Sequence, residues 1–505
     1  MESIKNLTNK LNDLERKLYA IRHLNNVVYT DAVTAAPSDS AAGRSFALEY
    51  LSEREYELTA SPETKALLTE LKTRRDEINA QQYRQAEYLL EAQERTAAIP
   101  QTEYVAYGTL LNEAEGVWEK AKHENDFEAF APYLEKIVET NIRFAEYWDP
   151  KGEKDPYDVL LDTYEKGMSM KEYDAFFEAL KGAIVPLVKQ IREKGKQPDV
   201  SFLKIEYPIE LQKKLSSELM KLLTIDPTHC TLAESEHPFT NSQNKDDVRI
   251  TTHYHLNDPM SSFYSVVHEG GHALYELHIG DGLRYTTISD GASCGVHEGQ
   301  SRFFENMIGR SREFCGTVLP IMKSIFPQQL EGVSDEAFYR AVNRAEPSLI
   351  RTESDELTYC LHIMVRYEIE KGLIHREISV ADLPRIWNEK MMEYLSVEVP
   401  DNTHGVLQDS HWAGGSFGYF PTYALGNAYA AQTAEVMSRD VDIAKCCAEG
   451  NLSPIVNWLS EHIYQYGCLY EPRELMRRCW NEEFTPQPYI NYLTKKYSEL
   501  YEIEE

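Results

Sequence analysis

Two histidines one helical turn apart are the residues with the clearest chemical potential in this sequence. They stand in His268-Glu269-Gly270-Gly271-His272, inside the apolar segment 261–277, which Asp258-Pro259 or Ser261 can begin as a helix. Positions i and i+4 of a helix share one face, so both imidazoles can bind a single metal ion. Zn²⁺ is the ion that this pattern predicts. Co²⁺ and Mn²⁺ are substitutes that such a site accepts.

The residues between the two histidines add to this interpretation. Glu269 lies one step round the helix from the ligand face, where its carboxylate can take a proton from water beside the ion. Gly270 and Gly271 each weaken a helix by about 1 kcal/mol relative to alanine. We therefore expect another part of the chain to approach this helix closely at the glycines.

A catalytic zinc ion needs a third protein ligand. The strongest candidate is Glu298, in the segment 297–306, which reads as the start of a second helix. His278 is excluded, because Tyr275 occupies the position where a return of the chain would need glycine. The alternatives that the sequence leaves open are Asp290, His297 and Glu276.

The elements that must position these residues are mostly helical. Apolar residues recur at steps of three and four in residues 4–29. Similar amphipathic segments span residues 63–98, 126–147, 170–194, 208–223 and 357–372. The β-branched stretch 247–255 alternates like a short strand. We predict a mostly α fold with one small β-sheet beside the metal helix, and no linker divides it into independent domains.

Composition narrows the class of protein. The chain has 505 residues and a net charge of −30, which argues against nucleic acid and anionic membranes as partners. The first twenty residues lack the apolar core of a signal peptide, and no apolar run is long enough to span a bilayer. Eight scattered cysteines form no Cys-x-x-Cys pattern. We expect a cytoplasmic protein with reduced thiols.

Taken together, the motifs resemble those of the carboxypeptidase Taq family of metallocarboxypeptidases. Six motifs occur in the family's order: His237-Pro238-Phe239, Asp247-Val-Arg249-Ile-Thr251, the metal motif, His297-Glu298-Gly299-Gln300, Arg351-Thr-Glu-Ser354-Asp355 and Gly405-Val-Leu-Gln408-Asp409-Ser-His411-Trp412. The chain departs from the family near its start, where Tyr29-Thr30-Asp31 and Ala36-Pro37 replace Trp-Asp and Met-Pro.

The resemblance implies a fold like that of angiotensin-converting enzyme and neurolysin. The expected architecture is a single catalytic domain, residues 1–505, with a deep groove and the metal at its floor. Helices within residues 1–100 would form a lid, and residues 230–430 would carry the catalytic motifs. The implied activity is release of single residues from peptide C-termini, with broad specificity and poor tolerance of proline. The implied assembly is a homodimer.

The resemblance also directs attention to residues outside the metal shell. A carboxypeptidase must bind a free carboxylate, which in so acidic a chain takes a dedicated arginine. Arg351 is the first choice and Arg249 the second, although Arg249 can instead pair with Asp247 or Asp355. Further expected substrate contacts come from His237, Asp355 and Gln408, where His237 has the alternative role of capping a turn.

Donors to the developing oxyanion are expected after the last motif. The candidates are His411, Tyr419 and Tyr423, by likeness to the His and Tyr that act in angiotensin-converting enzyme. The strand 248–254 has two interpretations, an edge that pairs with the substrate backbone or an internal hairpin edge. Two rival functions remain, an oligopeptidase that cuts internally and a peptide-binding protein without activity.

Overall fold

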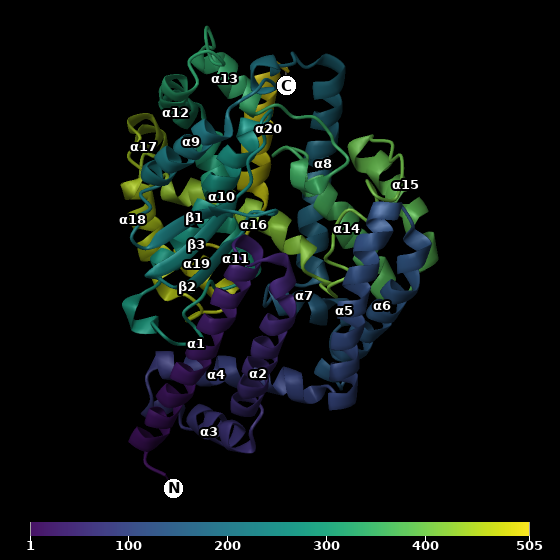
Figure 1. Ribbon diagram of the computed structural model, residues 1–505, viewed down its shortest axis with the longest axis vertical. Coiled ribbons are helices and arrows are strands. Elements are labelled where there is room, and N and C mark those ends of the chain that lie inside the picture. The colour runs from purple at the N-terminus through teal and green to yellow at the C-terminus, as the bar shows by residue number, and fades with distance from the viewer. Residues whose placement is uncertain (1, 504–505) are drawn as a thin grey trace.

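The computed structural model describes residues 2–503 and shows a mostly helical protein with one three-stranded sheet (Figure 1). This confirms the predicted fold class. The N-terminal helices are α1 (Ile4–Thr34), α2 (Ala41–Thr59), α3 (Pro62–Thr73) and α4 (Ala80–Ala98). The next group is α5 (Gln101–Glu124), α6 (Phe127–Trp148), α7 (Pro156–Tyr164), α8 (Met170–Lys194) and α9 (Ile209–Leu222).

The remaining helices follow the sheet in the sequence, and the first of them carries the metal motif. They are α10 (Pro259–Leu277), α11 (Cys294–Arg302), α12 (Arg312–Ile325), α13 (Asp335–Val342), α14 (Tyr359–Ile374), α15 (Leu383–Leu395) and α16 (Phe420–Met437). The last four are α17 (Ile443–Glu449), α18 (Ser453–His462), α19 (Pro472–Trp480) and α20 (Gln487–Tyr501). Within residues 2–503, no helix is long and apolar enough to cross a bilayer.

Residues 63–98, predicted as one amphipathic segment, form two helices. The break falls between α3 and α4, where Arg75–Glu77 make a short 3₁₀ turn. Asn79 then starts α4 with a capping box: its side chain accepts from the Gln82 amide at 2.8 Å, and the Gln82 side chain accepts from the Asn79 amide at 3.2 Å. A reciprocal cap of this kind satisfies two free amide groups and so favours a new helix start over a continuous helix.

The sheet lies against the metal helix. Its strands are β1 (Cys230–Glu234), β2 (Thr240–Asn244) and β3 (Asp247–Thr252), in the order β1-β3-β2. The central strand β3 pairs in parallel with β1 and antiparallel with β2. The interpretation of 248–254 as an edge that takes the substrate backbone is therefore wrong, because both of its sides are already paired.

The N-terminal helices have a small apolar core of their own. It consists of Leu7, Leu11, Leu14, Leu18, Leu68, Leu71, Ala86, Leu89 and Leu90 and is separate from the main core. Polar contacts join α1 to the sheet: the Asn26 side chain donates to the Ser242 carbonyl at 2.9 Å, and the Asn241 side chain donates to the Thr30 hydroxyl at 2.9 Å. These helices therefore touch the catalytic part of the chain through hydrogen bonds, ion pairs and ring contacts rather than through a shared core.

Candidate metal centre

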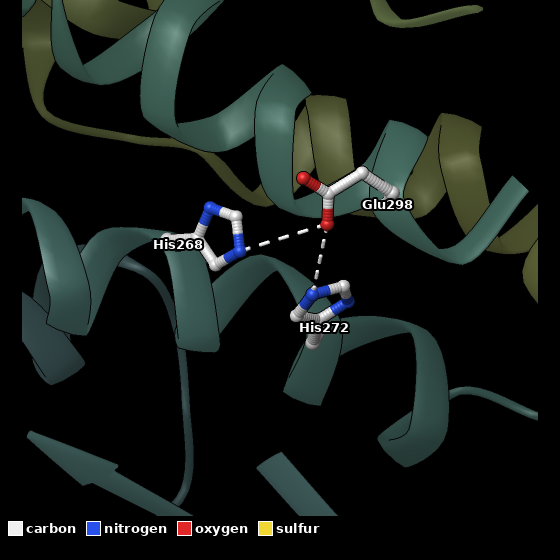
Figure 2. A group of neighbouring side chains, drawn as sticks. All are labelled: His268, His272 and Glu298. Carbon is white, nitrogen blue, oxygen red and sulfur yellow. Dashed lines mark ion pairs between the residues drawn. The ribbon is translucent and has the colours of Figure 1, made fainter. Parts of the chain in front are cut away.

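Three side chains from two crossing helices converge on one point. His268 and His272 come from α10, and Glu298 comes from α11 (Figure 2). The Oε2 atom of Glu298 lies 3.7 Å from Nε2 of His268 and 3.4 Å from Nε2 of His272. All three donor atoms lie within 4.8 Å of one another, a spacing that one ion can bridge.

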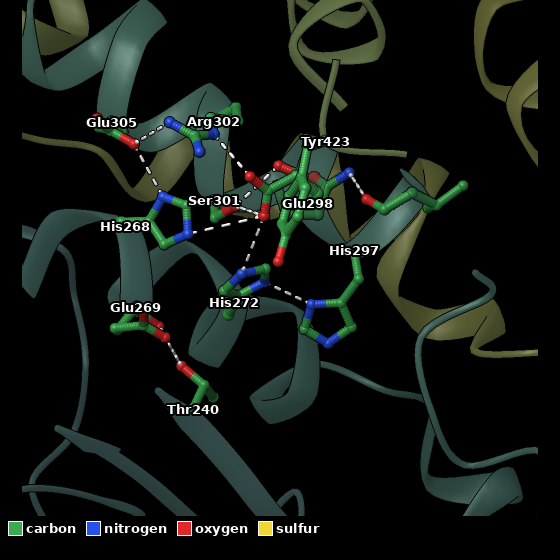
Figure 3. Close-up of polar contacts among 12 residues, drawn as sticks. Thr240, His268, Glu269, His272, His297, Glu298, Ser301, Arg302, Glu305 and Tyr423 are labelled. Carbon is green, nitrogen blue, oxygen red and sulfur yellow. Dashed lines mark hydrogen bonds and ion pairs between the residues drawn. The ribbon is translucent and has the colours of Figure 1, made fainter. Parts of the chain in front are cut away.

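A second set of side chains fixes both imidazoles with Nε2 toward this point (Figure 3). Nδ1 of His268 donates to Glu305 at 2.8 Å. Nδ1 of His272 lies 2.5 Å from Nδ1 of His297, whose Nε2 in turn lies 2.9 Å from Glu276. In the tautomer of His297 that carries its proton on Nε2, this N–H donates to Glu276. Nδ1 of His297 then accepts a hydrogen bond from Nδ1 of His272. Such outer contacts set the tautomer of a metal-binding histidine.

Two of the alternative ligands, His297 and Glu276, lie outside the group of three donors. His297 and Glu276 lie behind His272 and hold it, while Glu298 faces both imidazoles. His278 directs its Nδ1 to the Leu274 carbonyl at 2.8 Å, as expected for a helix that continues past Tyr275.

Glu298 is held as an anion. Its Oε1 accepts from Arg302 at 2.6 Å, and its Oε2 accepts from the Ser301 hydroxyl at 3.1 Å. Burial raises the pKa of Glu298, but the charge of Arg302, the nearby His268 and a hydrogen bond with His272 outweigh burial and hold it well below its usual range. Burial, with His297 alongside, lowers the pKa of His272 to about 3. A carboxylate and a neutral imidazole are the forms that bind a divalent metal, so the donor set fits such an ion.

The two glycines of the metal motif allow the close approach that the sequence predicted. A Cβ atom on Gly271 would lie 2.7 Å from the Gln300 carbonyl oxygen and the Ser301 Cα, so α11 crosses α10 at backbone distance. On the other side of α11, a Cβ on Gly426 of α16 would lie 2.6 Å from the Glu298 Cγ. Small residues on both flanking helices thus let α11 bring its carboxylate to the histidines.

Glu269 points away from the three donors toward the sheet (Figure 3). Its Oε2 accepts from the Thr240 hydroxyl of β2 at 2.6 Å. Burial raises its pKa, against the opposing effects of His268 and Thr240. A carboxylate with a raised pKa beside a metal site is suited to accept a proton at neutral pH.

One cavity of about 1130 Å³ contains the whole arrangement. Its wall includes His268, Glu269, His272 and Glu298, together with Thr240, Tyr419 and Tyr423. The opposite wall is formed partly by α4, through Arg84, Tyr88, Glu91, Ala92, Glu94, Arg95 and Ala98. A cavity of this size accommodates an extended peptide of several residues.

The predicted oxyanion donors form one cluster at this cavity. Tyr423 lies beside Glu298 in Figure 3, and its hydroxyl is 3.2 Å from Nε2 of His411. The Tyr419 ring packs edge-on against Tyr423 with centroids 5.1 Å apart. Burial raises the pKa of the Tyr423 phenol well above its usual value, and burial lowers the pKa of His411 to about 4. At pH 7 the phenol is therefore a hydrogen-bond donor and the imidazole is neutral.

Arg351, the first choice for a carboxylate-binding residue, lies outside the cavity lining. Its Nε and Nη2 both donate to Asp409, at 3.2 and 2.8 Å, and its Nη1 donates to Tyr359 at 3.2 Å. The Gln408 side chain accepts from the Arg351 backbone amide at 3.0 Å. Gln408 is buried and belongs to the same hydrogen-bond network. The guanidinium carbon lies 5.0 Å from the centre of the Tyr423 ring. Asp409 also pairs with Arg366, so one carboxylate serves two guanidinium groups. All three nitrogens of the Arg351 guanidinium are nevertheless engaged within the protein, so its place favours support of Tyr423 rather than contact with a substrate.

The other predicted substrate contacts are also engaged elsewhere. Arg249 donates from Nε and Nη2 to the two oxygens of Asp247, both at 2.8 Å. Asp355 accepts from the amides of Leu357 and Thr358 and from the Thr358 hydroxyl, in the turn that precedes α14. His237 is exposed, and only its neighbours Pro238 and Phe239 line the cavity.

Sequence reasoning missed three residues that complete the site: Thr240, Arg302 and Glu305. Arg302 bridges two of its carboxylates, because it donates to Glu298 and also to Glu305, at 3.1 Å. Glu298, Arg302 and Glu305 recur at steps of four and three, a signal for one helical face that was available in the sequence. From Phe303 to Gly309 the helix is π-helical, which alters this spacing locally. No pattern in the sequence around Thr240 indicates its contact with Glu269.

Three metal-binding side chains on the wall of a peptide-sized cavity, with the Glu269 carboxylate beside them, are the arrangement expected of a metal-dependent peptidase. The family comparison agrees: residues 10–497 match the model of the carboxypeptidase Taq (M32) metallopeptidases. The chain belongs to this family, which confirms the resemblance found in the motifs. Membership implies a divalent metal and hydrolysis of peptide bonds.

Individual relatives span nearly the whole chain. Carboxypeptidase 1 of Bacillus subtilis is 40% identical over 476 residues, covering 94% of this chain and 95% of the relative. Thermostable carboxypeptidase 1 of Pyrococcus furiosus is 35% identical over 494 residues, covering 95% and 96%. Among solved structures, the M32 carboxypeptidase of Deinococcus radiodurans R1 superimposes with a TM-score of 0.95 at 31% identity, covering 99% and 100%.

The crossing of α10 and α11 predicts different effects for the two motif glycines. Gly271→Ala forces two backbones apart and should lower metal affinity about 10–100-fold, with a loss of about 1–3 kcal/mol in unfolding free energy. Gly270→Ala is the matched control, because its Cβ would meet side chains and no backbone: Leu223 at 2.5 Å and Ile225 at 3.4 Å. Metal titration and denaturant unfolding measure both. Equal metal affinities for the two variants would contradict the crossing as the cause.

The ligand assignment predicts opposite results for Glu298→Ala and His278→Ala. Removing Glu298 takes away a donor and leaves Arg302 without its partner, so metal affinity should fall at least about 100-fold. His278 hydrogen-bonds its own helix, so its loss should leave metal content unchanged. Metal content after dialysis against a weak chelator measures both. A metal-free His278→Ala protein would overturn the assignment.

Proposed function

We propose that this protein is a zinc-dependent metallocarboxypeptidase that releases single C-terminal residues from peptides. The observation that carries the proposal is the convergence of His268, His272 and Glu298 in one cavity with Glu269 beside them. Two imidazoles and one carboxylate favour zinc, with cobalt or manganese as substitutes. By family membership we extend the proposal to broad specificity with proline disfavoured.

His268, His272 and Glu298 would hold the ion. When bound, it supplies Lewis acidity, which polarises the scissile carbonyl and makes water more acidic. Glu269 takes the proton from the attacking water and passes it to the departing amine. Oε2 of Glu269 accepts a hydrogen bond from Thr240. Within residues 2–503 no hydrogen bond engages Oε1, so Oε1 is available to take the proton from water.

Tyr423 supplies a hydrogen bond to the oxygen that becomes negative during attack. Its phenol stays protonated at neutral pH because burial raises its pKa. His411 orients the hydroxyl from 3.2 Å, and Arg351 supports the ring from behind. Tyr419 packs on Tyr423 and has its own place on the cavity wall.

The larger architecture supports a lid over this centre. Helices within residues 1–100 have their own core, and α4 contributes one wall of the cavity. We assign residues 1–505 to one peptidase domain, with residues 230–430 as the catalytic part. Movement of α1–α4 would admit and enclose a peptide. A homodimer in the cytoplasm, with peptides as the sole partners and neither nucleic acid nor membranes bound, completes the proposal.

One observation favours a second candidate, an oligopeptidase that cuts internally. Neither Arg351 nor Arg249 lines the cavity, and each pairs with an aspartate of the protein. A cavity that lacks these clamps has less reason to require a free C-terminus. Activity on C-terminally amidated peptides distinguishes the two candidates.

The direct test follows an unblocked peptide by mass spectrometry over time, with and without a chelator. The proposal expects successive loss of single C-terminal residues, and expects the chelator to stop it until zinc is restored. Internal fragments, or cleavage of the amidated peptide at the same rate, would favour the oligopeptidase. No cleavage by the zinc-loaded protein would favour a peptide-binding protein without activity.

Glu269→Gln should keep the metal and lose about 10²–10⁴-fold in kcat. Its side chain lies beside the donors rather than among them, and glutamine preserves the contact with Thr240 while it removes the base. Turnover and metal content are measured on the same preparation. Loss of metal from this variant would show that Glu269 is a ligand.

Tyr423→Phe should lower kcat about 10²–10³-fold, because it removes one donor to the oxyanion and leaves the ring in place. Tyr419→Phe is the matched control and should cost far less. Both should keep the metal. The comparison of kcat for the two variants tests which phenol acts, and a larger loss for Tyr419→Phe would reverse the assignment.

A further inference from the structure

Cationic side chains on the cavity wall are nearly all neutralised. Of the lysines and arginines that line it within residues 2–503, Arg84 pairs with Glu471 at 2.6 Å and Lys166 pairs with Glu91 at 2.7 Å. Lys154 lies 3.7 Å from Asp162. These ion pairs also account for the cluster of Glu87, Glu91 and Glu471, which is therefore held by protein cations.

Arg95 is the exception. Its guanidinium has no salt bridge and no hydrogen bond to any residue in the described range 2–503. The nearest acidic influences are Asp162 and Glu91, and each is engaged by a lysine. Burial lowers the pKa of Arg95 against the weaker opposing effect of these carboxylates. A half-buried cation without a counter-ion is stabilised when an anion arrives.

The side chain of Arg95 is nevertheless held in position. Its guanidinium carbon lies 4.9 Å from the centre of the Trp148 ring, and the Trp148 Nε1 donates to the Arg95 carbonyl at 3.0 Å. Stacking on an aromatic face leaves the N–H groups at the edge of the guanidinium free. Trp148 and Arg95 both line the cavity. The arrangement is an oriented donor fork without an acceptor.

The rest of the cavity wall is unfavourable to a substrate carboxylate. Away from the metal site, seven acidic residues line the cavity against four lysines and arginines; the acidic ones are Glu91, Glu94, Asp149, Glu153, Asp162, Asp290 and Glu471. Like charges across a narrow water-filled space repel an incoming carboxylate. Within the described residues, Arg95 is thus the lysine or arginine of the cavity wall whose charge is left for a ligand.

We propose that Arg95 is a specificity residue that binds a carboxylate of the peptide substrate. The carboxylate belongs either to an acidic side chain or to the peptide's C-terminus, and one planar fork recognises both. This inference rests on the proposed function, because the ligand is the peptide of that reaction.

The experiment uses the zinc-loaded protein and the variants Arg95→Ala and Arg95→Lys. Peptides of one length carry Glu or Gln at each position in turn, and kcat/KM is measured for every pair. Inhibition constants are measured for matched peptides with a free or an amidated C-terminus. Arg143→Ala is the control, because it removes a positive charge from an exposed position on α6 outside the cavity.

If the ligand is a side chain, the wild type should prefer Glu to Gln about tenfold at one position. Arg95→Ala should abolish that preference and leave the Gln peptides within about twofold of wild type, while Arg95→Lys retains part of it. If the ligand is the C-terminus, Arg95→Ala should weaken every free-acid peptide about tenfold. The amidated inhibitor should then bind as before.

The proposal is overturned if Arg95→Ala matches Arg143→Ala on every peptide. It is also overturned if acid and amidated peptides lose affinity equally, since Arg95 would then only stack on Trp148. Failure of the proposed function looks different, because the wild type would release no residue from any peptide. In that case, dissociation constants of the same Glu, Gln, acid and amide peptides test Arg95 without turnover.

Discussion

The contact between the backbones of α10 and α11 at Gly271 is the constraint on which the site depends. Two histidines four residues apart provide only half of a metal centre, because a single helix cannot also turn a carboxylate back onto their face. The third donor has to arrive from another helix, at the distance that Gly271 and Gly426 permit. Any side chain at Gly271 would move Glu298 away from both imidazoles.

Ion pairs and hydrogen bonds hold in position the metal donors that helix packing brings together. Glu298 is buried, and without Arg302 its anionic form would be unfavourable before a metal arrives. Arg302 is balanced in turn by Glu305, which also orients His268. The chain Glu276–His297–His272 orients the second imidazole in the same way. The donors are thus kept in position by the protein, which reduces the reorganisation that metal binding requires.

Local patterns predicted the local features well. Periodicity in neighbouring residues indicated the spacing of His268 and His272 and the strand before the metal helix. It also gave, to within one residue at each end, the helices predicted at 126–147, 170–194 and 208–223. The predictions were less successful for residues whose contacts depend on partners far away in the sequence. Arg351 was expected at the substrate because nothing nearby in the sequence showed that Asp409 would bind it. The central place of β3 depends on β1 and β2, and the free charge of Arg95 depends on which distant carboxylates the lysines take.

The central claim is that His268, His272 and Glu298 together hold the ion. Anomalous diffraction at the zinc edge, from crystals of the zinc-loaded protein, tests it most directly. The account predicts one strong peak at the crossing of α10 and α11, bonded to Nε2 of both histidines at about 2.0–2.1 Å and to Glu298 at about 2.0–2.2 Å. A peak bonded instead to His297 or Glu276, or one that excludes Glu298, would contradict it.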